Sequence, residues 1–366
     1  MDLVLASRVL MGDSLGFHII FVLFGLTLPI LVSWFEFTGL RKGDPRYLNT
    51  ARLWSKIMAL LVIAGVISGT IVALQMSLVW PGILKFGGDV IGLPFMFETY
   101  AFLIEAVFLA LYMTTWNNKK ISGWLHWLFG LGIIIGSIAS AFAITSVSAW
   151  MNLPAGFTFT DGMLKNIDVF KAMFSETSLI EFIHSMPGYF LAASTAIAGI
   201  YAIKLLCIRR KERTGTKHAF DWLVVQRLMI FASIAFVATV VTADLTGKYL
   251  AKNEPAKLAT IEMVNKTTSN VPFVFGGVDG GNGKIAGPYI EIPGALSFLA
   301  GSSTTSSVTG LDAIAKNEQP PTVIRPLFNL KLTFIIALTI LIVGYFILRW
   351  LRPTWLYHRL SLLALA

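Results

Sequence analysis

The sequence has little cysteine and little charge. Cys207 is the one cysteine among 366 residues, which excludes an intrachain disulfide and a thiolate metal cluster. Charged residues make up 13% of the chain, whereas a soluble globular domain has about 25%. Hydrophobic residues make up 55%, and the mean hydropathy is +0.72. We therefore expect a polytopic membrane protein.

The excess of positive charge has a topological explanation. The net charge of +9 is compatible with nucleic-acid binding, but the basic residues gather between apolar runs, as the positive-inside rule predicts for cytoplasmic loops. They form three groups: Arg41, Lys42 and Arg46; Lys119 and Lys120; and Arg209, Arg210, Lys211, Arg213 and Lys217. We expect no nucleic-acid partner. The first thirty residues lack a basic start and a cleavage site, which predicts a retained first helix. Because the basic loops are expected in the cytoplasm, we expect the N-terminus outside.

Seven apolar runs are long enough to cross a bilayer. Because they lack strand alternation, and because backbone polar groups in lipid need internal partners, the runs predict helices. The predicted spans are residues 11–35, 52–77, 90–115, 123–150, 179–206, 222–245 and 327–350. The expected fold is an all-α polytopic membrane protein with about seven transmembrane helices in a bundle and one long outward-facing loop.

This division predicts three regions. They are a six-helix bundle over 1–245, an outward-facing loop over 246–325, and the seventh helix with a short tail over 326–366. The loop is rich in Gly, Ser, Thr, Asn and Pro, and loops of this length are functional or disordered. Its segment Phe275–Lys284 ends in Gly-Lys but lacks the other residues of a phosphate-binding loop. We expect a flexible turn region there.

The third span carries two carboxylates, Glu98 and Glu105. Acids are costly in hydrocarbon, so they indicate a function. Seven residues on a helix make about two turns, which puts both acids on one face roughly 10 Å apart along the axis. This geometry predicts a proton path or the edge of a buried redox centre.

Two histidines, His18 and His184, also fall within predicted spans. A single membrane histidine commonly hydrogen-bonds a neighbouring helix. Two histidines on separate helices, together with two acids on a third, favour haem, since imidazole is a common axial ligand of haem iron. We expect His126 to pack at the membrane interface, and His218 and His358 to face solvent.

The outer end of the sixth span introduces further polar residues, Asp244, Lys257 and Glu262. One interpretation is a solvated helix end and loop. The other is a polar mouth that binds the headgroup of a lipid-soluble substrate and takes up its protons. Both interpretations are compatible with the residues alone.

Ordered blocks of residues run from Arg8 to about Leu327. The blocks are Arg8, His18, Trp54-Ser55-Lys56, Gly69-Thr70, Gln75, Trp80, Gly88-Asp89, Gly92, Pro94, Glu98, Ala101-Phe102, Glu105, Ser140-Ala141-Phe142, Trp150-Met151, Pro154-Ala155-Gly156, His184, Gly188-Tyr189, Asp244, Gly247, Lys257–Glu262, Ile292–Ser297 and Val308–Leu311. In this order they resemble subunit I of the cytochrome bd family of quinol oxidases. The resemblance implies a multi-pass protein of a prokaryotic cell membrane, with the N-terminus and the quinol loop outside.

The resemblance also implies a reaction and its residues. The complex would oxidise quinol at the outward loop and reduce O2 to water at buried haems, with protons from the cytoplasm. His18 would ligate the iron of one haem of the oxygen-reducing pair, either haem b or the chlorin-type haem d, and His184 that of a low-spin haem b. The residues implied at the cofactors are Arg8, Trp54, Lys56 and Gln75; those on the proton path are Glu98, Glu105 and Ser140; those at the quinol are Asp244, Lys257 and Glu262.

The sequence departs from the family pattern at several positions. The family's methionine ligand of the low-spin haem and the arginine before it correspond to Phe334 and Leu332, and no Met follows Met263. A family Glu is Ala73, a family Asn is Ser148, and two further spans do not appear before Ala366. We expect a second membrane subunit, either a subunit I relative or a subunit II-like chain, to supply the missing spans, or the oxygen-reducing pair to be incomplete in this chain.

Three functions are therefore compared. The first is a haem-bearing subunit of a bd-like quinol oxidase. The second is a degenerate paralogous subunit that scaffolds an active partner and binds one haem or none. The third is a transporter with a carboxylate-lined proton path, against which the lack of visible repeats of discontinuous helices argues. The retained histidines and acids favour the first.

Overall fold

The computed structural model describes residues 3–208, 218–280 and 284–366. Within these ranges seven helices are long and apolar enough to cross a membrane, so the predicted all-α polytopic class is confirmed. The chain divides into two compact units: residues 1–198 with 219–232, and residues 199–218 with 233–366. The third basic group, Arg209 to Lys217, lies outside the described residues.

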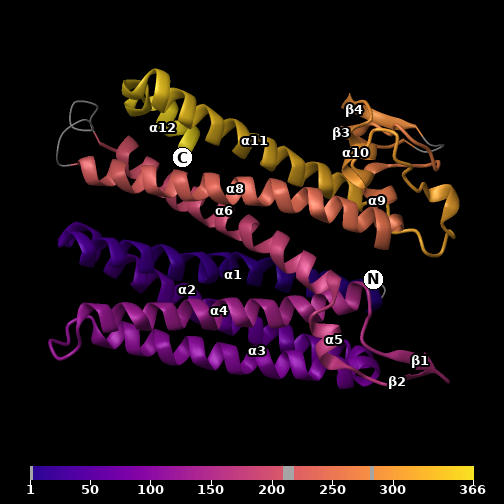
Figure 1. Cartoon of the computed structure of the whole chain (residues 1–366), viewed down its shortest axis with the longest axis horizontal. Helices are drawn as coiled ribbons and strands as arrows, with labels where there is room; N and C mark the ends of the chain where they lie inside the picture. The colour runs from indigo at the N-terminus through magenta and orange to yellow at the C-terminus, as the bar shows by residue number, and fades with distance from the viewer. Residues whose placement is uncertain (1–2, 209–217, 281–283) are drawn as a thin grey trace. The chain divides into compact units, whose positions relative to one another are not determined.

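The first unit is built on four long helices (Figure 1). They are α1 (Leu3–Lys42), α2 (Pro45–Val79), α3 (Pro81–Thr115) and α4 (Gly123–Asn152). Two of them, α2 and α4, begin at a residue whose side chain caps the helix. Asp44 caps α2 by accepting a hydrogen bond from the Arg46 amide at 2.9 Å, and Ser122 caps α4 by accepting one from the Leu125 amide at 3.2 Å.

The turns after α1 and after α3 share one end of this unit. The indole Nε1 of Trp127, near the start of α4, donates to the carbonyl oxygen of Ser33, near the end of α1, at 3.1 Å. The basic groups of the first and third loops therefore lie at the same end, as the positive-inside argument requires. Which side of the membrane this end faces stays a prediction.

Close helix packing explains why small residues recur in α4. An ideal Cβ built on Gly136 would lie 2.7 Å from the backbone nitrogen of Glu105 and 2.9 Å from the carbonyl oxygen of Ala101. In lipid, helices associate through such close approaches of small residues. The backbones of α3 and α4 therefore meet at the level of Glu105.

A hairpin and a short helix lead from α4 to the fifth long helix. The strands are β1 (Thr158–Thr160) and β2 (Met163–Lys165), paired antiparallel. Both loop residues between them, Asp161 and Gly162, have positive φ, which is typical of a tight two-residue hairpin turn. Helices α5 (Val169–Met173) and α6 (Glu176–Leu206) follow.

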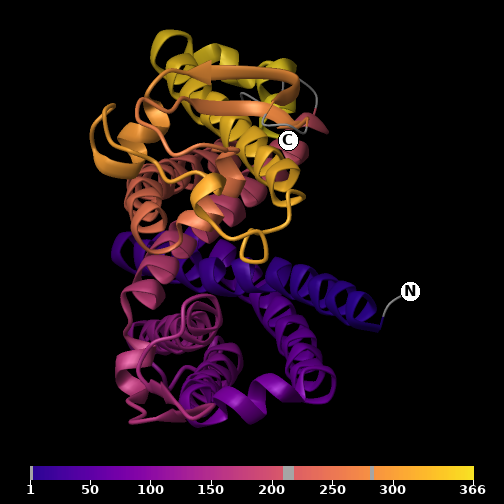
Figure 2. The same cartoon turned by 90° about the vertical axis from the view of Figure 1, so that its right-hand side faces the viewer.

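The second unit contains the C-terminal half of α8 (Ala219–Asn253) and the segments that follow it. These are α9 (Pro255–Glu262), β3 (Phe273–Asp279), β4 (Ile285–Ile292), α10 (Ala295–Gly301), η2 (Leu311–Ala313), α11 (Ile324–Leu351), η3 (Pro353–Tyr357) and α12 (Arg359–Leu365). Figures 1 and 2 show the hairpin β3–β4 beside α11.

The polar loop of the second unit has a small core of its own. The core consists of Leu258, Ala259, Val264, Val271, Leu296 and Val308, all buried. The predicted turn region Phe275–Lys284 is wrong for its first five residues, which belong to β3. Glycines in this segment suggested a turn, but Gly276 and Gly277 adopt positive φ within an irregular stretch of the hairpin and so fit a β-bulge.

Candidate functional site

His18, the first predicted haem ligand, lies against α2. Its Nδ1 is 2.9 Å from Ser68 Oγ, and an ideal Cβ on Gly69 would lie 2.9 Å from its Cε1. The Ser68 hydroxyl also donates to the carbonyl oxygens of Ala64 and Gly65, at 2.9 and 3.0 Å. Since a hydroxyl has one proton, Oγ then accepts from Nδ1–H, which leaves the lone pair on Nε2. An imidazole oriented this way fits an axial ligand of haem iron.

One level further along the same helix pair, Gln75 of α2 meets α1. Its amide Nε2 donates to Ser14 Oγ at 2.7 Å. Its Oε1 is buried and has no hydrogen-bond partner among the described residues. A buried acceptor of this kind is costly unless a bound group or water satisfies it, which fits a cofactor or a bound water beside His18 and Gln75.

Three other predicted cofactor residues lie elsewhere. Trp54 is buried and packs on Phe35, with ring centroids 4.7 Å apart. It precedes Ser68 by fourteen residues on α2, or about 21 Å along the helix axis. Lys56 and Arg8 are exposed in this chain. The structure does not bring Trp54 or Lys56 to the level of His18, and their cofactor roles stay predictions.

The predicted proton-path residues come from α3 and α4. Ser140 Oγ lies 3.5 Å from Glu98 Oε1, at the limit of a hydrogen bond. Glu105 is 7% exposed and lies where the two backbones meet at Gly136. The structure thus brings Glu98 and Ser140 together and keeps Glu105 buried two turns away on the same helix.

His184, the second predicted ligand, lies on α6 of the first unit. Two residues later, Met186 packs in an apolar cluster with Leu26 of α1 and Ala141 of α4. This contact directs the N-terminal half of α6 against the helices that carry His18 and Ser140. His184 is half-buried there, and its role as a ligand stays a prediction.

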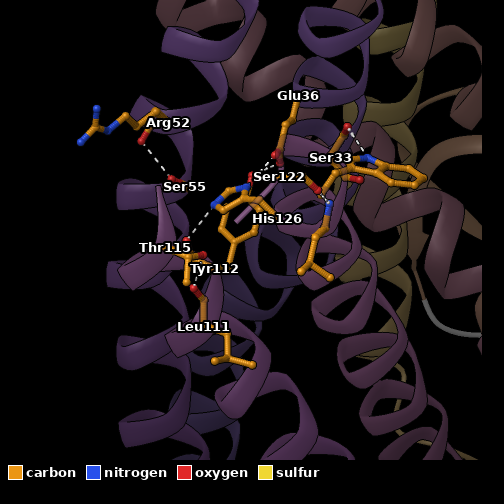
Figure 3. Close-up of polar contacts among 11 residues, drawn as sticks. Ser33, Glu36, Arg52, Ser55, Leu111, Tyr112, Thr115, Ser122 and His126 are labelled. Atoms are coloured by element: carbon orange, nitrogen blue, oxygen red, sulfur yellow. Dashed lines mark hydrogen bonds and ion pairs between the residues drawn. The ribbon is translucent and has the colours of Figure 1, made fainter. Parts of the chain in front are cut away.

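Three buried residues from three helices form a cluster that the sequence did not predict (Figure 3). Glu36 of α1, Tyr112 of α3 and His126 of α4 are 1%, 0% and 5% exposed. Tyr112 Oη donates to Glu36 Oε2 at 2.6 Å, His126 Nδ1 lies 2.6 Å from Glu36 Oε1, and His126 Nε2 donates to the Tyr112 carbonyl oxygen at 3.0 Å. We call these three residues the Glu36 cluster.

His126 lies in the first turn of α4 and is buried within the helix bundle, and its expected position at the membrane interface stays a prediction. Its ring stacks near Tyr112 and Trp116, with centroids 4.3 and 4.4 Å away, and both ring nitrogens have polar partners. Two signals were available in the sequence. Glu36 directly follows the predicted span 11–35, and Tyr112 follows Glu105 by seven residues, on the same helix face.

The predicted quinol residues occupy different surroundings in the second unit. Asp244 pairs with Lys248 at 2.5 Å, and Lys257 pairs with Glu254 at 3.0 Å. All four side chains keep some exposure. Asp244 lies two turns inside α8, because that helix continues to Asn253 instead of ending near 245.

Glu262, at the end of α9, is buried beside Arg325. Arg325 Nη1 lies 3.2 Å from Glu262 Oε2, with side-chain exposures of 1% and 3%. Burial raises the pKa of Glu262 to about 7, and the guanidinium of Arg325 opposes the shift. Lys257 and Glu262 are five residues apart on one helix, or about 140° around its axis, so they do not share a face.

The family model for cytochrome bd terminal oxidase subunit I matches residues 6–366. The "Putative cytochrome bd menaquinol oxidase subunit I" of Bacillus subtilis (strain 168) is 34% identical over 328 residues, which cover 90% of this chain and 73% of that protein. The "Cytochrome bd ubiquinol oxidase subunit 1" of the same organism is 30% identical over 319 residues, 86% of this chain and 65% of that protein.

A solved structure of a bd oxidase also resembles this chain. The bd oxidase from Geobacillus thermodenitrificans aligns with a TM-score of 0.92 and 34% identity, over 100% of this chain and 83% of that chain. The resemblance inferred from the ordered residue blocks is thereby confirmed. On the sequence match and the fold together, the chain belongs to the cytochrome bd terminal oxidase subunit I family.

Proposed function

We propose that this chain is a haem-bearing subunit of a membrane oxidase that oxidises quinol and reduces O2 to water, with protons from the cytoplasm. Membership in the family implies haem cofactors and a quinol substrate. The observation that carries the proposal is the His18–Ser68 contact of 2.9 Å, because it leaves Nε2 as the ligating nitrogen.

The haems, when bound, accept electrons from quinol and bind and reduce O2. In this proposal His18 and His184 hold their irons, and Gln75 with Ser14 borders the His18 site. An imidazole can ligate the iron of either haem b or haem d, so His18 is compatible with both. Arg8, Trp54 and Lys56 are proposed cofactor contacts on the family pattern alone.

Protons for water formation are assigned to the acids of α3. Glu105 is buried between α3 and α4, so its carboxyl is shielded from solvent and can pass a proton only along a defined route. Glu98 and Ser140 lie two helical turns further along, where the Ser140 hydroxyl contacts the carboxyl at 3.5 Å. We assign Glu105, Glu98 and Ser140 to successive positions on this route.

Quinol oxidation is assigned to the second unit. Lys257, with 38% side-chain exposure, presents an ammonium to a substrate headgroup, and Asp244 offers a carboxylate on α8. Glu262 has its carboxyl engaged by Arg325, so its proposed contribution includes holding α9 in place. A second membrane subunit, related to subunit I or to subunit II, is the proposed partner.

The first experiment is a reduced-minus-oxidised absorption spectrum, with haem quantification and carbon monoxide binding, on the purified complex. We expect His18→Ala to remove a carbon monoxide-reactive component and His184→Ala to remove a low-spin component. An unchanged low-spin spectrum in His184→Ala would show that this ligand assignment is wrong. Quinol-driven O2 consumption by the wild-type complex then tests the reaction itself.

A second candidate is a subunit that scaffolds an active partner and binds one haem or none. It is favoured by Phe334 of α11, which offers no ligating atom where the family pattern has a methionine, and by Leu332, which stands where the pattern has an arginine. Haem content separates the two candidates. A complex with normal quinol turnover after both His18→Ala and His184→Ala would support the scaffold.

A further inference from the structure

Among the described residues, the Glu36 cluster is a buried group of titratable side chains that the proposed reaction does not yet use. Its three side chains come from α1, α3 and α4 and point toward one another (Figure 3). Each is 5% exposed or less. Buried acids and histidines are costly unless they are paired, and in membrane proteins such groups commonly mark proton routes.

The hydrogen bonds fix how many protons the cluster holds. Nε2 of His126 faces a backbone carbonyl oxygen, which only accepts, so Nε2 carries a proton. Nδ1 and Glu36 Oε1 are 2.6 Å apart, so one proton lies between them, on either atom. Without that proton an imidazole lone pair would face a carboxylate at this distance.

The cluster is also in register with the proposed proton route. Glu98, Glu105 and Tyr112 follow one another at intervals of seven residues on one face of α3, each step about 10 Å along the axis. On the antiparallel helix α4, Ser140 and His126 are separated by the same fourteen residues as Glu98 and Tyr112. The Glu98–Ser140 contact and the contacts of Tyr112 with His126 are thus matching levels of one helix pair.

These residues follow one another from one end of the helix pair toward the other. The Glu36 cluster lies nearest the turns after α1 and α3, and Glu105, then Glu98 with Ser140, lie progressively further from them. His18 lies eighteen residues from Glu36 on α1, or about 27 Å along the axis. The levels thus lead from the end with Arg41, Lys42, Lys119 and Lys120 toward the predicted haem ligand.

We propose that the Glu36 cluster is the entry station of the proton route, loading protons from the end of the unit that carries these basic turns and passing them by way of Tyr112 toward Glu105. The proposal rests on the proposed oxidase function. In the loading step one proton from water joins the Glu36–His126 pair. In the delivery step the Tyr112 hydroxyl, which donates to Glu36 Oε2 in the arrangement described here, turns and releases its proton toward Glu105. It then receives one proton from the Glu36 carboxyl group.

The step is balanced and needs no other reactant. One proton enters and one leaves, no electron moves, and no bond between heavy atoms changes. The proposal requires water molecules to bridge the interval of about 10 Å, measured along the helix axis, between the levels of Tyr112 and Glu105. The rings of Tyr112 and Trp116 lie beside that of His126, with centroids 4.3 and 4.4 Å away.

The test is Glu36→Gln in the complete complex, followed by rapid-mixing kinetics of O2 reduction in H2O and D2O. Glutamine keeps the shape, accepts from the Tyr112 hydroxyl and donates to His126 Nδ1, but it has no exchangeable acidic proton. We expect haem content, the carbon monoxide spectrum and the initial O2-binding phase to stay as in the wild type. The proton-coupled phase should slow by about tenfold or more, with a changed solvent isotope effect.

Two further variants separate proton transfer from packing. Tyr112→Phe removes the hydroxyl but leaves the Glu36–His126 contact, and we expect it to slow the same phase. Trp127→Phe removes the Trp127–Ser33 hydrogen bond between α1 and α4 without touching an acid, and we expect wild-type kinetics. Equal slowing in Trp127→Phe and Glu36→Gln would overturn the proposal, because loosened helix packing would then explain both.

Glu105→Gln distinguishes failure of this inference from failure of the proposed function. Slow proton uptake in Glu105→Gln with wild-type kinetics in Glu36→Gln would refute the entry station alone. Wild-type kinetics in both variants would also remove Glu105 from the proton route. If Glu36→Gln lowers the haem content, the kinetics of Tyr112→Phe test the proposal instead. Wild-type kinetics in Tyr112→Phe would refute a proton route through the Tyr112 hydroxyl.

Discussion

Arg325, at the start of α11, holds Glu262, at the end of α9, in a buried ion pair with 3.2 Å between Nη1 and Oε2. The same guanidinium donates to the carbonyl oxygens of Ile261, Val274 and Gly276 at 2.6, 2.6 and 3.0 Å. One side chain therefore joins α9, the strand β3 and α11. It anchors the loop that carries the proposed quinol residues to a membrane-spanning helix.

Arg325→Ala should destabilise the second unit strongly. The substitution leaves the Glu262 carboxylate without its counter-charge and three carbonyl oxygens without a donor, and breaking a buried pair on one side costs about 3–5 kcal/mol. We expect the loss to be larger at pH 8 than at pH 5, since a neutral carboxyl needs no counter-charge. Thermal unfolding of the detergent-solubilised complex at both pH values measures it.

Lys257→Ala is the matched control for this change. It removes an ion pair from the same helix, α9, but the Lys257 side chain is 38% exposed. Exposed pairs contribute about 0–1 kcal/mol, so the unfolding temperature should hardly change. A similar loss in both variants would contradict the anchoring role of Arg325.

Glu262→Gln should remove a pH dependence of stability. Because burial raises the pKa of Glu262 from 4.5 to about 7, the folded protein binds this proton more tightly than the unfolded chain. The free energy of unfolding is then highest below the ordinary value and falls by up to about 3 kcal/mol as the pH rises toward 7. Chemical unfolding between pH 4.5 and 7.5 should show this fall in the wild type and a flatter profile in the variant.

Ser68→Ala tests the orientation of His18 without removing the ligand. The hydroxyl holds Nδ1 at 2.9 Å, and losing such an outer contact weakens metal ligation by about 10- to 100-fold. We expect reduced haem retention on dilution or detergent washing, with the band of the His18 haem shifted. Thr70→Val is a suitable comparison, because the Thr70 hydroxyl donates only within its own helix, to the carbonyl oxygen of Val66. Full retention of haem in Ser68→Ala would show that Ser68 does not orient the ligand.

Much of the fold could be predicted from the sequence because it depends on run length and hydropathy. The seven spans and the class follow from apolar runs that only helices can carry through lipid. The ends could not be predicted: α8 continues to Asn253 through residues polar enough to suggest a loop. The hairpin β3–β4 escaped notice since its glycines, Gly276 and Gly277, resemble a turn more than a bulge.

The sequence predicted those site residues that stand out within a single apolar run. Glu98 and Glu105 stand out because acids are rare in such runs, and their spacing on one helix gives their relation directly. The Glu36 cluster depends on contacts between residues ninety positions apart, Glu36 and His126, which no periodicity encodes. Arg325 was missed for the same reason, because its partners come from segments folded onto α11 from far earlier in the chain.

Gly136→Ala should disturb the level of Glu105 without changing any polar group. The added methyl would lie 2.7 Å from the Glu105 backbone nitrogen and 2.9 Å from the Ala101 carbonyl oxygen, so α3 and α4 must separate, at a cost of about 1–3 kcal/mol. Gly344→Ala in α11 has nothing within 4 Å and should be neutral or slightly stabilising, by up to about 1 kcal/mol. The unfolding temperatures of the two variants and the O2-reduction kinetics of Gly136→Ala would check this prediction. Equal stability of the two variants would mean that α3 and α4 are not in close contact at Gly136.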